Sequence, residues 1–290
     1  MNMMHRGLVG SFGSSGTTPL DEGQLRRLAP SIFAEAKHDS RSERYTYIPT
    51  WEIVQALIQE GFEPMNAKQG GSRVAGKADF TKHMVRFRHG TAEMRQVGDT
   101  RPEIVLINSH DGTSSYRILA GLFRLVCLNG MVAADGLVDD VRVGHSGNIR
   151  DKVVEGTWSV VHQVERVMER PRAWSEIEVK ADEARALAKA AHALRFDDEG
   201  LQAELVKPET LLVPRREEDR GNTLWQTFNR LQENTTKGGQ YVSGWVTTAD
   251  GRRQMRRSQT RPVNSIDGDV KLNRALWVLA EEMAKIKGAA

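Results

Sequence analysis

Residues 102–130, PEIVLINSHDGTSSYRILAGLFRLVCLNG, are the most apolar stretch of a chain that is otherwise polar. At its centre lies Asp111-Gly112, and Asp-Gly between two apolar runs favours a type I′ hairpin turn because both residues tolerate positive φ. The stretch therefore predicts a strand over 103–109 that pairs with a second strand over 113–126. Residues 104–107 are apolar without alternation, which indicates a central strand buried on both faces.

The bulk composition describes a globular protein. The chain has 290 residues, 27% of them charged, and a net charge of +3, which allows one large domain or two ordinary ones. The single cysteine, Cys127, excludes a disulfide within the chain and favours a reducing cytoplasmic setting, with the thiol packed as a small hydrophobe. No segment has the length of a signal peptide or the ~20 apolar residues of a membrane span, so we expect no membrane partner.

Upstream of this stretch the pattern predicts a helix and a strand with a basic face. Residues 51–58 carry apolar side chains at helical spacing, with Thr50 as the cap and Gly61 as the stop. Residues 65–79 indicate a loop or ragged hairpin, and residues 80–89 (FTKHMVRFRH) a strand.

Alternation in the strand at 80–89 separates its two faces. Val85 and Phe87 point to a core, and the other face carries Lys82, Arg86 and Arg88 beside Met84. This row of cations is either a solvated sheet face or a surface that meets phosphates.

Downstream the chain becomes mostly helical. A strand is predicted over 138–143, and helices over 149–169, 176–194, 222–234 and 270–286. Arg170-Pro171 is expected to end the first of these helices, because proline breaks a helix interior. Asp250-Gly251 marks a second turn, within an irregular or β-like segment.

The fold class that follows is α+β. We expect an antiparallel β-sheet with helices packed on one face, followed by a mainly helical C-terminal region. The predicted units are a flexible arm at 1–18, a core domain at 19–172 and the C-terminal region at 173–290, which contains a basic segment at 250–262.

This basic segment is the strongest functional signal. It carries Arg252, Arg253, Arg256, Arg257 and Arg261, with Tyr241 and Trp245 close by in the sequence. The segment is either a solvated basic loop or an electrostatic clamp on nucleic acid, with an aromatic ring available for stacking on bases. No base-reading helix of a known DNA-binding motif accompanies it, so binding would be directed mainly at the backbone.

Motifs for enzyme chemistry are weak. The sequence has no phosphate-cradling glycine loop, nucleophile signature or metal-ligand spacing, so we expect no cofactor, no metal and no enzymatic activity. Glu178 and Lys180 match the E-x-K end of a metal-dependent nuclease motif, which leaves a nuclease as the third alternative.

Seven segments together carry a resemblance to a known family. They are RYTYIPT (44–50), HMVRFRH (83–89), PEIVLINSHDGTSSYR (102–117), GLFRLVCLNG (121–130), GHSG (144–147), LWQTFNRLQEN (224–234) and LNRALWVLAE (272–281). In these segments the chain resembles uncharacterised phage- or plasmid-like proteins that contain a domain of unknown function (family 932). The resemblance implies a phage, prophage or mobile-element context and supplies no activity.

A second similarity concerns residues 47–62 and the passage from hairpins to a long helix. This order of elements is similar to the annealing core of the ring-forming eukaryotic recombination mediator and its phage relatives. That similarity implies single-stranded DNA binding along a basic groove of an oligomeric ring, without a nucleotide cofactor.

The sequence therefore favours a single-stranded DNA-binding protein that acts in strand annealing as a homo-oligomer. Lys82, Arg86, Arg88 and the arginines of 252–261 would track phosphates, and Tyr241 or Trp245 would stack on bases. Replication or recombination proteins of the host or phage are further expected partners. The alternative is an interaction protein that acts on a host factor, which predicts an exposed apolar patch away from the cations.

Overall fold

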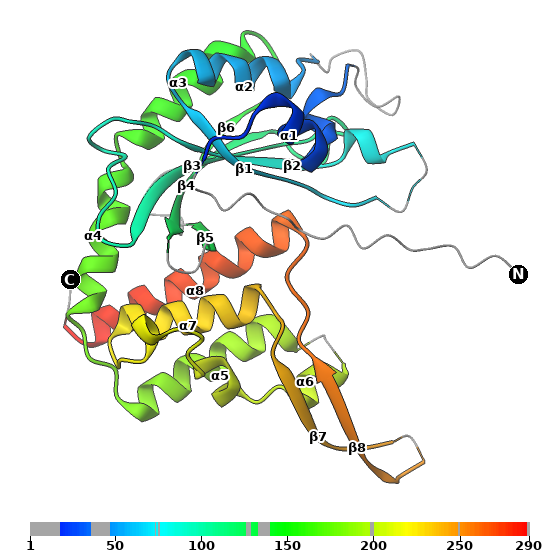
Figure 1. Cartoon of the computed structure of the whole chain (residues 1–290), viewed down its shortest axis with the longest axis vertical. Coiled ribbons are helices and arrows are strands. Elements are labelled where there is room, and N and C mark those ends of the chain that lie inside the picture. Colours follow the sequence, from blue (N-terminus) through cyan, green and yellow to red (C-terminus); the bar gives the residue numbers. More distant parts are fainter. Residues whose placement is uncertain are drawn as a thin grey trace, which may run out of the picture.

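The structure, a computed structural model, describes residues 18–35, 47–72, 74, 76–125, 129–132, 140–197, 200–248 and 250–288. It confirms the predicted α+β class, with an antiparallel sheet, helices packed on it and a mainly helical C-terminal region (Figure 1). The predicted arm, apart from Thr18, lies outside the described residues, and so does Cys127.

The main sheet has the strand order β1-β2-β3-β4-β5, with β6 also paired to β4, and every pairing is antiparallel. The strands are β1 (Glu63–Gln69), β2 (His83–Arg88), β3 (Thr100–Asn108), β4 (Tyr116–Arg124), β5 (Asn129–Val132) and β6 (Val141–Val143). The segment predicted as a loop or ragged hairpin thus contributes β1, because pairing with β2 stabilises a sequence with little strand character of its own.

The hairpin of β3 and β4 confirms the anchor of the sequence analysis, but its connection is longer than predicted. The strands are joined by the loop 109–115 rather than by a two-residue turn. Asp111 explains the difference, since its carboxylate accepts hydrogen bonds from the backbone N–H of Thr113 at 3.0 Å and from the Thr113 hydroxyl at 2.6 Å. This local turn competes with the tight hairpin, and Gly112 still supplies positive φ, at 74°.

One face of the sheet is covered by α1 (Glu22–Leu28), α2 (Thr50–Gln59) and α3 (Ile149–Val161), above the sheet in Figure 1. The alternate strand residues Val85, Phe87, Ile104 and Leu106 join the core beneath these helices. Gly61 ends α2 with a φ of 91°, as predicted.

Thr50 was predicted to cap α2, and this role is wrong. Thr50 is the first residue inside the helix, and its buried hydroxyl contacts the Nε2 atoms of His83 at 2.9 Å and His110 at 3.0 Å. Asn108 Nδ2 donates to the same hydroxyl oxygen at 3.0 Å. Burial is the main cause that lowers the pKa of His83 to about 3 and that of His110 to about 4.

The single helix predicted over 149–169 is also a wrong expectation. It is divided at residues 162–163 into α3 and α4 (Val164–Ser175), and Pro171 lies inside α4 instead of ending a helix. Pro171 is buried, as are Val167 and Trp174 on the same helix, so tertiary packing outweighs the hydrogen bond that proline removes.

The C-terminal region forms a second layer, below the sheet in Figure 1. Its helices are α5 (Ala181–Phe196), α6 (Leu201–Leu205), α7 (Leu224–Thr236) and α8 (Ile266–Ile286), with short 3-10 turns at Pro208–Leu212 and Glu217–Asp219. Two further 3-10 turns, Pro30–Phe33 and Ala78–Phe80, belong to the first half of the chain. From α8, Ile266 and Val270 pack with Met84 of β2 and with Val105 and Ile107 of β3. The second face of the sheet is therefore covered by the last helix of the chain.

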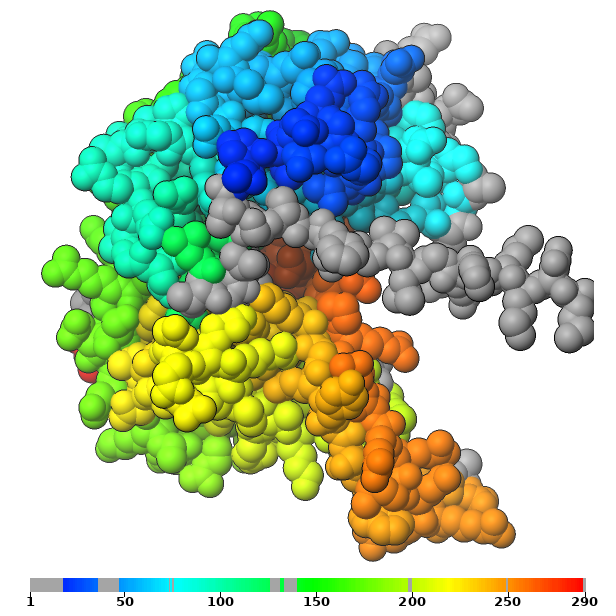
Figure 2. Space-filling model, viewed as in Figure 1, coloured from blue at the N-terminus to red at the C-terminus, as the bar shows by residue number. Residues whose placement is uncertain are grey.

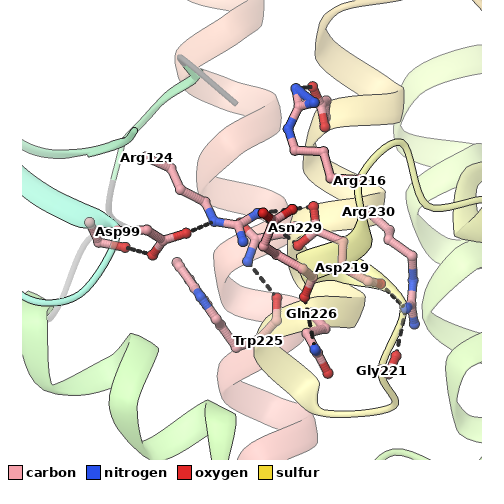
Figure 3. A network of polar contacts seen from close by, with 12 residues as sticks. Asp99, Arg124, Arg216, Asp219, Gly221, Trp225, Gln226, Asn229 and Arg230 are labelled. Carbon is pink, nitrogen blue, oxygen red and sulfur yellow. Dashed lines mark hydrogen bonds and ion pairs between the residues drawn. The ribbon is translucent and has the colours of Figure 1, made fainter. Parts of the chain in front are cut away.

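Arg124, at the end of β4, joins the sheet to the C-terminal region (Figure 3). Its Nη1 atom donates to both carboxylate oxygens of Asp219, at 2.7 and 3.0 Å, and its Nε donates to Asp99 at 2.6 Å. Asp219 is only 1% exposed, and burial raises the pKa of its carboxyl. Arg124 opposes this rise because its charge favours the carboxylate.

None of the helices in the described ranges has the length and the apolar composition needed to cross a membrane.

Candidate nucleic-acid interface

Two strands outside the main sheet, β7 (Tyr241–Thr247) and β8 (Arg253–Gln259), form an antiparallel hairpin. It projects from the body of the molecule at the lower right of Figures 1 and 2. Gly251 has a φ of 78° in the connection, which fits the turn predicted at Asp250-Gly251. The segment expected to be irregular or β-like is therefore a regular β-hairpin.

The register of this hairpin gathers aromatic and basic side chains on one face. Trp245 lies opposite Met255, and Ser243 lies opposite Arg257. Because side chains alternate along a strand, one face carries Tyr241, Trp245, Arg253, Met255 and Arg257, which we call the hairpin face. Met255 was not among the predicted site residues, although period-2 alternation from Arg253 and Arg257 identifies it.

The opposite face of the hairpin explains why the first is exposed. Val242 and Val246 are buried, and the hairpin contacts α6. A Cβ atom at Gly244 would lie 3.2 Å from the side chain of Leu205, so α6 approaches this face closely. Packing on α6 therefore fixes which side of the hairpin is presented to solvent.

The hairpin face combines large exposed rings with guanidinium groups. Tyr241 is 84% exposed and Trp245 is 59% exposed, both unusually high for aromatic side chains. The guanidinium carbon of Arg253 lies 5.7 Å from the centre of the Trp245 ring, a cation–π contact. Such a face can stack on flat apolar surfaces and attract anions at the same time.

The structure brings together only part of the predicted arginine set. Arg253 and Arg257 lie on the hairpin face, and Arg256, opposite Gly244, lies on the other side of the ribbon. Arg252 is in the turn, where its Nε is 3.4 Å from the Asp250 carboxylate. Arg261 follows β8, is exposed, and accepts a hydrogen bond at its carbonyl from Arg195.

The second predicted group, on β2, is not the exposed cationic face that we expected. Arg86 and Arg88 are 4% and 3% exposed, and both guanidiniums contact the carboxylate of Glu103, which is 1% exposed. The side chain of Lys82 is 17% exposed and pairs with Asp267 of α8 at 2.6 Å. We therefore withdraw these three residues as surface contacts to phosphates.

The side chains of β2 alternate as predicted. The face that carries the arginines is buried instead of exposed because α8 covers it. Arg86 and Arg88 share this face with Met84, which packs against α8. Arg86 also donates to the backbone carbonyls of Leu122 and Met131, at 3.2 and 2.9 Å. Glu103, a carboxylate next to the apolar run of β3, was the available sequence signal for a buried cation partner.

The residues of the E-x-K motif do not come together as a nuclease site in the described structure. Glu178 forms a backbone bridge with Thr223, and Lys180 is the N-terminal cap residue of α5. In the described ranges no three His, Cys, Asp or Glu side chains form a group that could hold a metal ion. The nuclease alternative stays a prediction without structural support.

The comparisons with known proteins agree on one family. The family model of the domain of unknown function DUF932 matches residues 37–277. The chain is 46% identical over 280 residues to the UPF0380 protein YafZ of Escherichia coli (strain K12), covering 95% of this chain and 97% of the relative. UPF0380 protein YfjQ of the same strain gives the same identity and coverage.

No solved structure matches the chain significantly. The similarity to ring-forming annealing proteins therefore stays a prediction. The family model and the two relatives cover most of the chain, and this extent decides the assignment. The chain belongs to the DUF932 family, the uncharacterised family that its sequence segments resemble.

Proposed function

We propose that this protein binds single-stranded DNA through the hairpin face. The observation that carries the proposal is the exposure of Tyr241 and Trp245 on the same side of the hairpin as Arg253 and Arg257. Exposed rings offer stacking platforms to unpaired bases, and the guanidiniums offer contacts to the phosphates between them. In a duplex the base faces are already stacked, so this chemistry selects single strands.

The position of the aromatic side chains favours nucleic acid over a host protein as the partner. The interaction-protein alternative predicts an apolar patch away from the cations. Instead, Tyr241 and Trp245, the two aromatic residues among the exposed large hydrophobics of the described chain, lie among arginines. A protein partner would have to be acidic as well as apolar to match this face.

Fluorescence anisotropy with a labelled single-stranded oligonucleotide tests the proposal. If Arg253 and Arg257, the arginines of the hairpin face, each hold a phosphate, raising the salt from ~50 to ~200 mM lowers affinity about 7-fold. Changing both to alanine removes most of this salt dependence, because both phosphate contacts are lost. Trp245→Ala lowers affinity about 5- to 150-fold at fixed salt, the range measured for stacking on one base.

The matched control removes the same charge elsewhere. Arg166 and Arg172 are exposed on α4, and their double alanine variant has the same net charge as the hairpin variant. It should bind like the wild type. An equal loss of oligonucleotide affinity in both double variants would show that overall charge alone causes the effect. The absence of binding at low salt would refute the proposal.

Strand annealing by an oligomer extends the same proposal. Annealing needs neutralised phosphates and accessible bases, and it requires no acid, base or nucleotide cofactor. Light scattering of the free and DNA-bound protein measures oligomer formation. Pairing of two complementary labelled strands measures annealing, which the Trp245→Ala variant should slow.

A further inference from the structure

A second basic site lies in a cavity at one end of the main sheet. The cavity has a volume of about 590 Å³ and is lined by Arg88 at the end of β2, Arg101 in β3, and Arg95 in the loop between these strands. Glu63 of β1 also lines the cavity. Its volume lies in the range of small-molecule sites, roughly 300–1,000 Å³.

The geometry of the strands brings the arginines together. Alternation places Arg101 on the same face as Glu103, two residues further along β3, and Glu103 contacts Arg88 across the strand pair. The Arg88 guanidinium lies 4.6 Å from the centre of the Phe123 ring, and its Nε donates to Glu103 at 3.0 Å. Arg88 is therefore held in place before any ligand arrives.

The cations around the cavity exceed the carboxylates that face them. Glu103 forms ion pairs with both Arg86 and Arg88. The charge of Arg86 also acts on the carboxyl of Asp269, whose pKa is raised by burial and lowered against that rise by Arg86. Among the described residues, Arg95 and Arg101 form no ion pair with a carboxylate, which leaves Glu63 as the acidic side chain of the lining. Burial lowers the pKa of Arg88, and the neighbouring charge of Arg101 adds to this effect.

Groups that can bind an oxyanion surround the same space. Arg95 is exposed and Arg101 is half-buried, so both are free to turn toward a ligand. His89 and Thr91 also line the cavity but are already engaged: the backbone N–H of Thr91 donates to His89 Nδ1 at 3.1 Å, and His89 Nε2 lies 3.0 Å from the carbonyl of Glu60. The two arginines are therefore the donors that a ligand would meet. Planar guanidiniums bind phosphate in a bidentate manner, which a single lysine does not reproduce.

We infer that this cavity binds a phosphate group, held by Arg95 and Arg101 beside the fixed guanidinium of Arg88. The phosphate belongs either to a small molecule such as a nucleotide or to the 5′ end of a DNA strand. The inference does not depend on the hairpin face, which lies in a separate part of the molecule.

Isothermal titration of the full chain tests the inference with three probes at matched ionic strength. The probes are inorganic phosphate, ATP with chelator, and a 5′-phosphorylated oligonucleotide compared with its unphosphorylated twin. We expect inorganic phosphate or ATP to bind, or the phosphorylated oligonucleotide to bind more tightly than its unphosphorylated twin. Arg95→Gln with Arg101→Gln should lower that affinity, or that preference, about tenfold or more, as for lost charge-assisted hydrogen bonds. Unfolding midpoints like that of the wild type confirm that the variant is folded.

Two controls separate this site from the hairpin and from general charge. Arg166→Gln with Arg172→Gln should leave the binding of inorganic phosphate and ATP unchanged. Arg253→Ala with Arg257→Ala weakens the binding of any strand at the hairpin face, but it should leave unchanged the ratio of affinities between the phosphorylated oligonucleotide and its unphosphorylated twin. A preference for ATP or phosphate identifies a small-molecule site, whereas a preference for the phosphorylated strand identifies a strand-end site. If neither inorganic phosphate nor ATP binds and the 5′ phosphate adds no affinity to the strand, the inference is overturned. It is also overturned if the Arg95 and Arg101 variant behaves as the wild type does with every probe.

Discussion

Replacing Arg124 by methionine should destabilise the joint between the sheet and the C-terminal region. The Arg124 side chain is 3% exposed and the Asp219 side chain 1% exposed, so the change leaves a buried carboxylate without its cation. Breaking a buried pair in this way costs about 3–5 kcal/mol of unfolding free energy. We expect a loss at the lower end of this range, because Asp99, the second ion-pair partner of Arg124, has a side chain that is 30% exposed and can be hydrated when Arg124 is removed.

A second variant separates the charge from the packing. Arg124→Met combined with Asp219→Asn removes both buried charges while keeping side chains of similar size. It should recover most of the lost stability, since replacing both members of a buried pair is often close to neutral. A double-mutant cycle with Asp219→Asn alone then measures the coupling between the two side chains.

Urea unfolding followed by tryptophan fluorescence measures these effects. In Arg124→Met the pKa of the Asp219 carboxyl, already raised in the folded protein, rises further above its unfolded value. The loss of unfolding free energy relative to the wild type is therefore complete above the folded-state pKa of Asp219 and becomes smaller as the pH falls toward that pKa. The loss should thus be smaller at pH 5 than at pH 7. A single-variant loss below ~1 kcal/mol, or a double variant as unstable as the single one, would refute this account of the joint.

Two further predictions concern the fold. The folded-state pKa values of His83 and His110 are lowered to about 3 and about 4. Between pH ~6.5 and 5 these two histidines therefore take up protons in the unfolded state but not in the folded state. The free energy of unfolding should fall as the pH is lowered through this range, by up to about 1.4 kcal/mol per pH unit for each histidine. Urea midpoints across this range check the slope, and a flat profile would contradict it. Gly156→Ala would place a Cβ atom 2.6 Å from Val141 and should cost about 1–3 kcal/mol in thermal or urea unfolding, whereas Gly144→Ala, which meets open space, serves as the neutral control.

Much of the fold follows from local sequence. The pairing of β3 with β4, the alternation of β2 and the helical faces of α2 and α7 agree with the expected patterns. The failures occur where distant residues intervene. Thr50 contacts two histidines instead of capping its helix, and Pro171 stays inside α4 because the surrounding helix face is buried.

The two predicted basic groups show what only the tertiary structure decided. Alternation predicted that Arg86 and Arg88 share one face of β2. The same rule puts Arg253 and Arg257 on one face of β8, although the segment was expected only to be irregular or β-like. The first face is covered by α8 and its arginines pair with Glu103, while the hairpin packs on α6 through its other face and leaves Trp245 exposed. Which residues share a face is a property of the strand itself, and the sequence therefore determines it. Whether that face meets water depends on segments far away in the chain, because burial is the outcome of packing between elements.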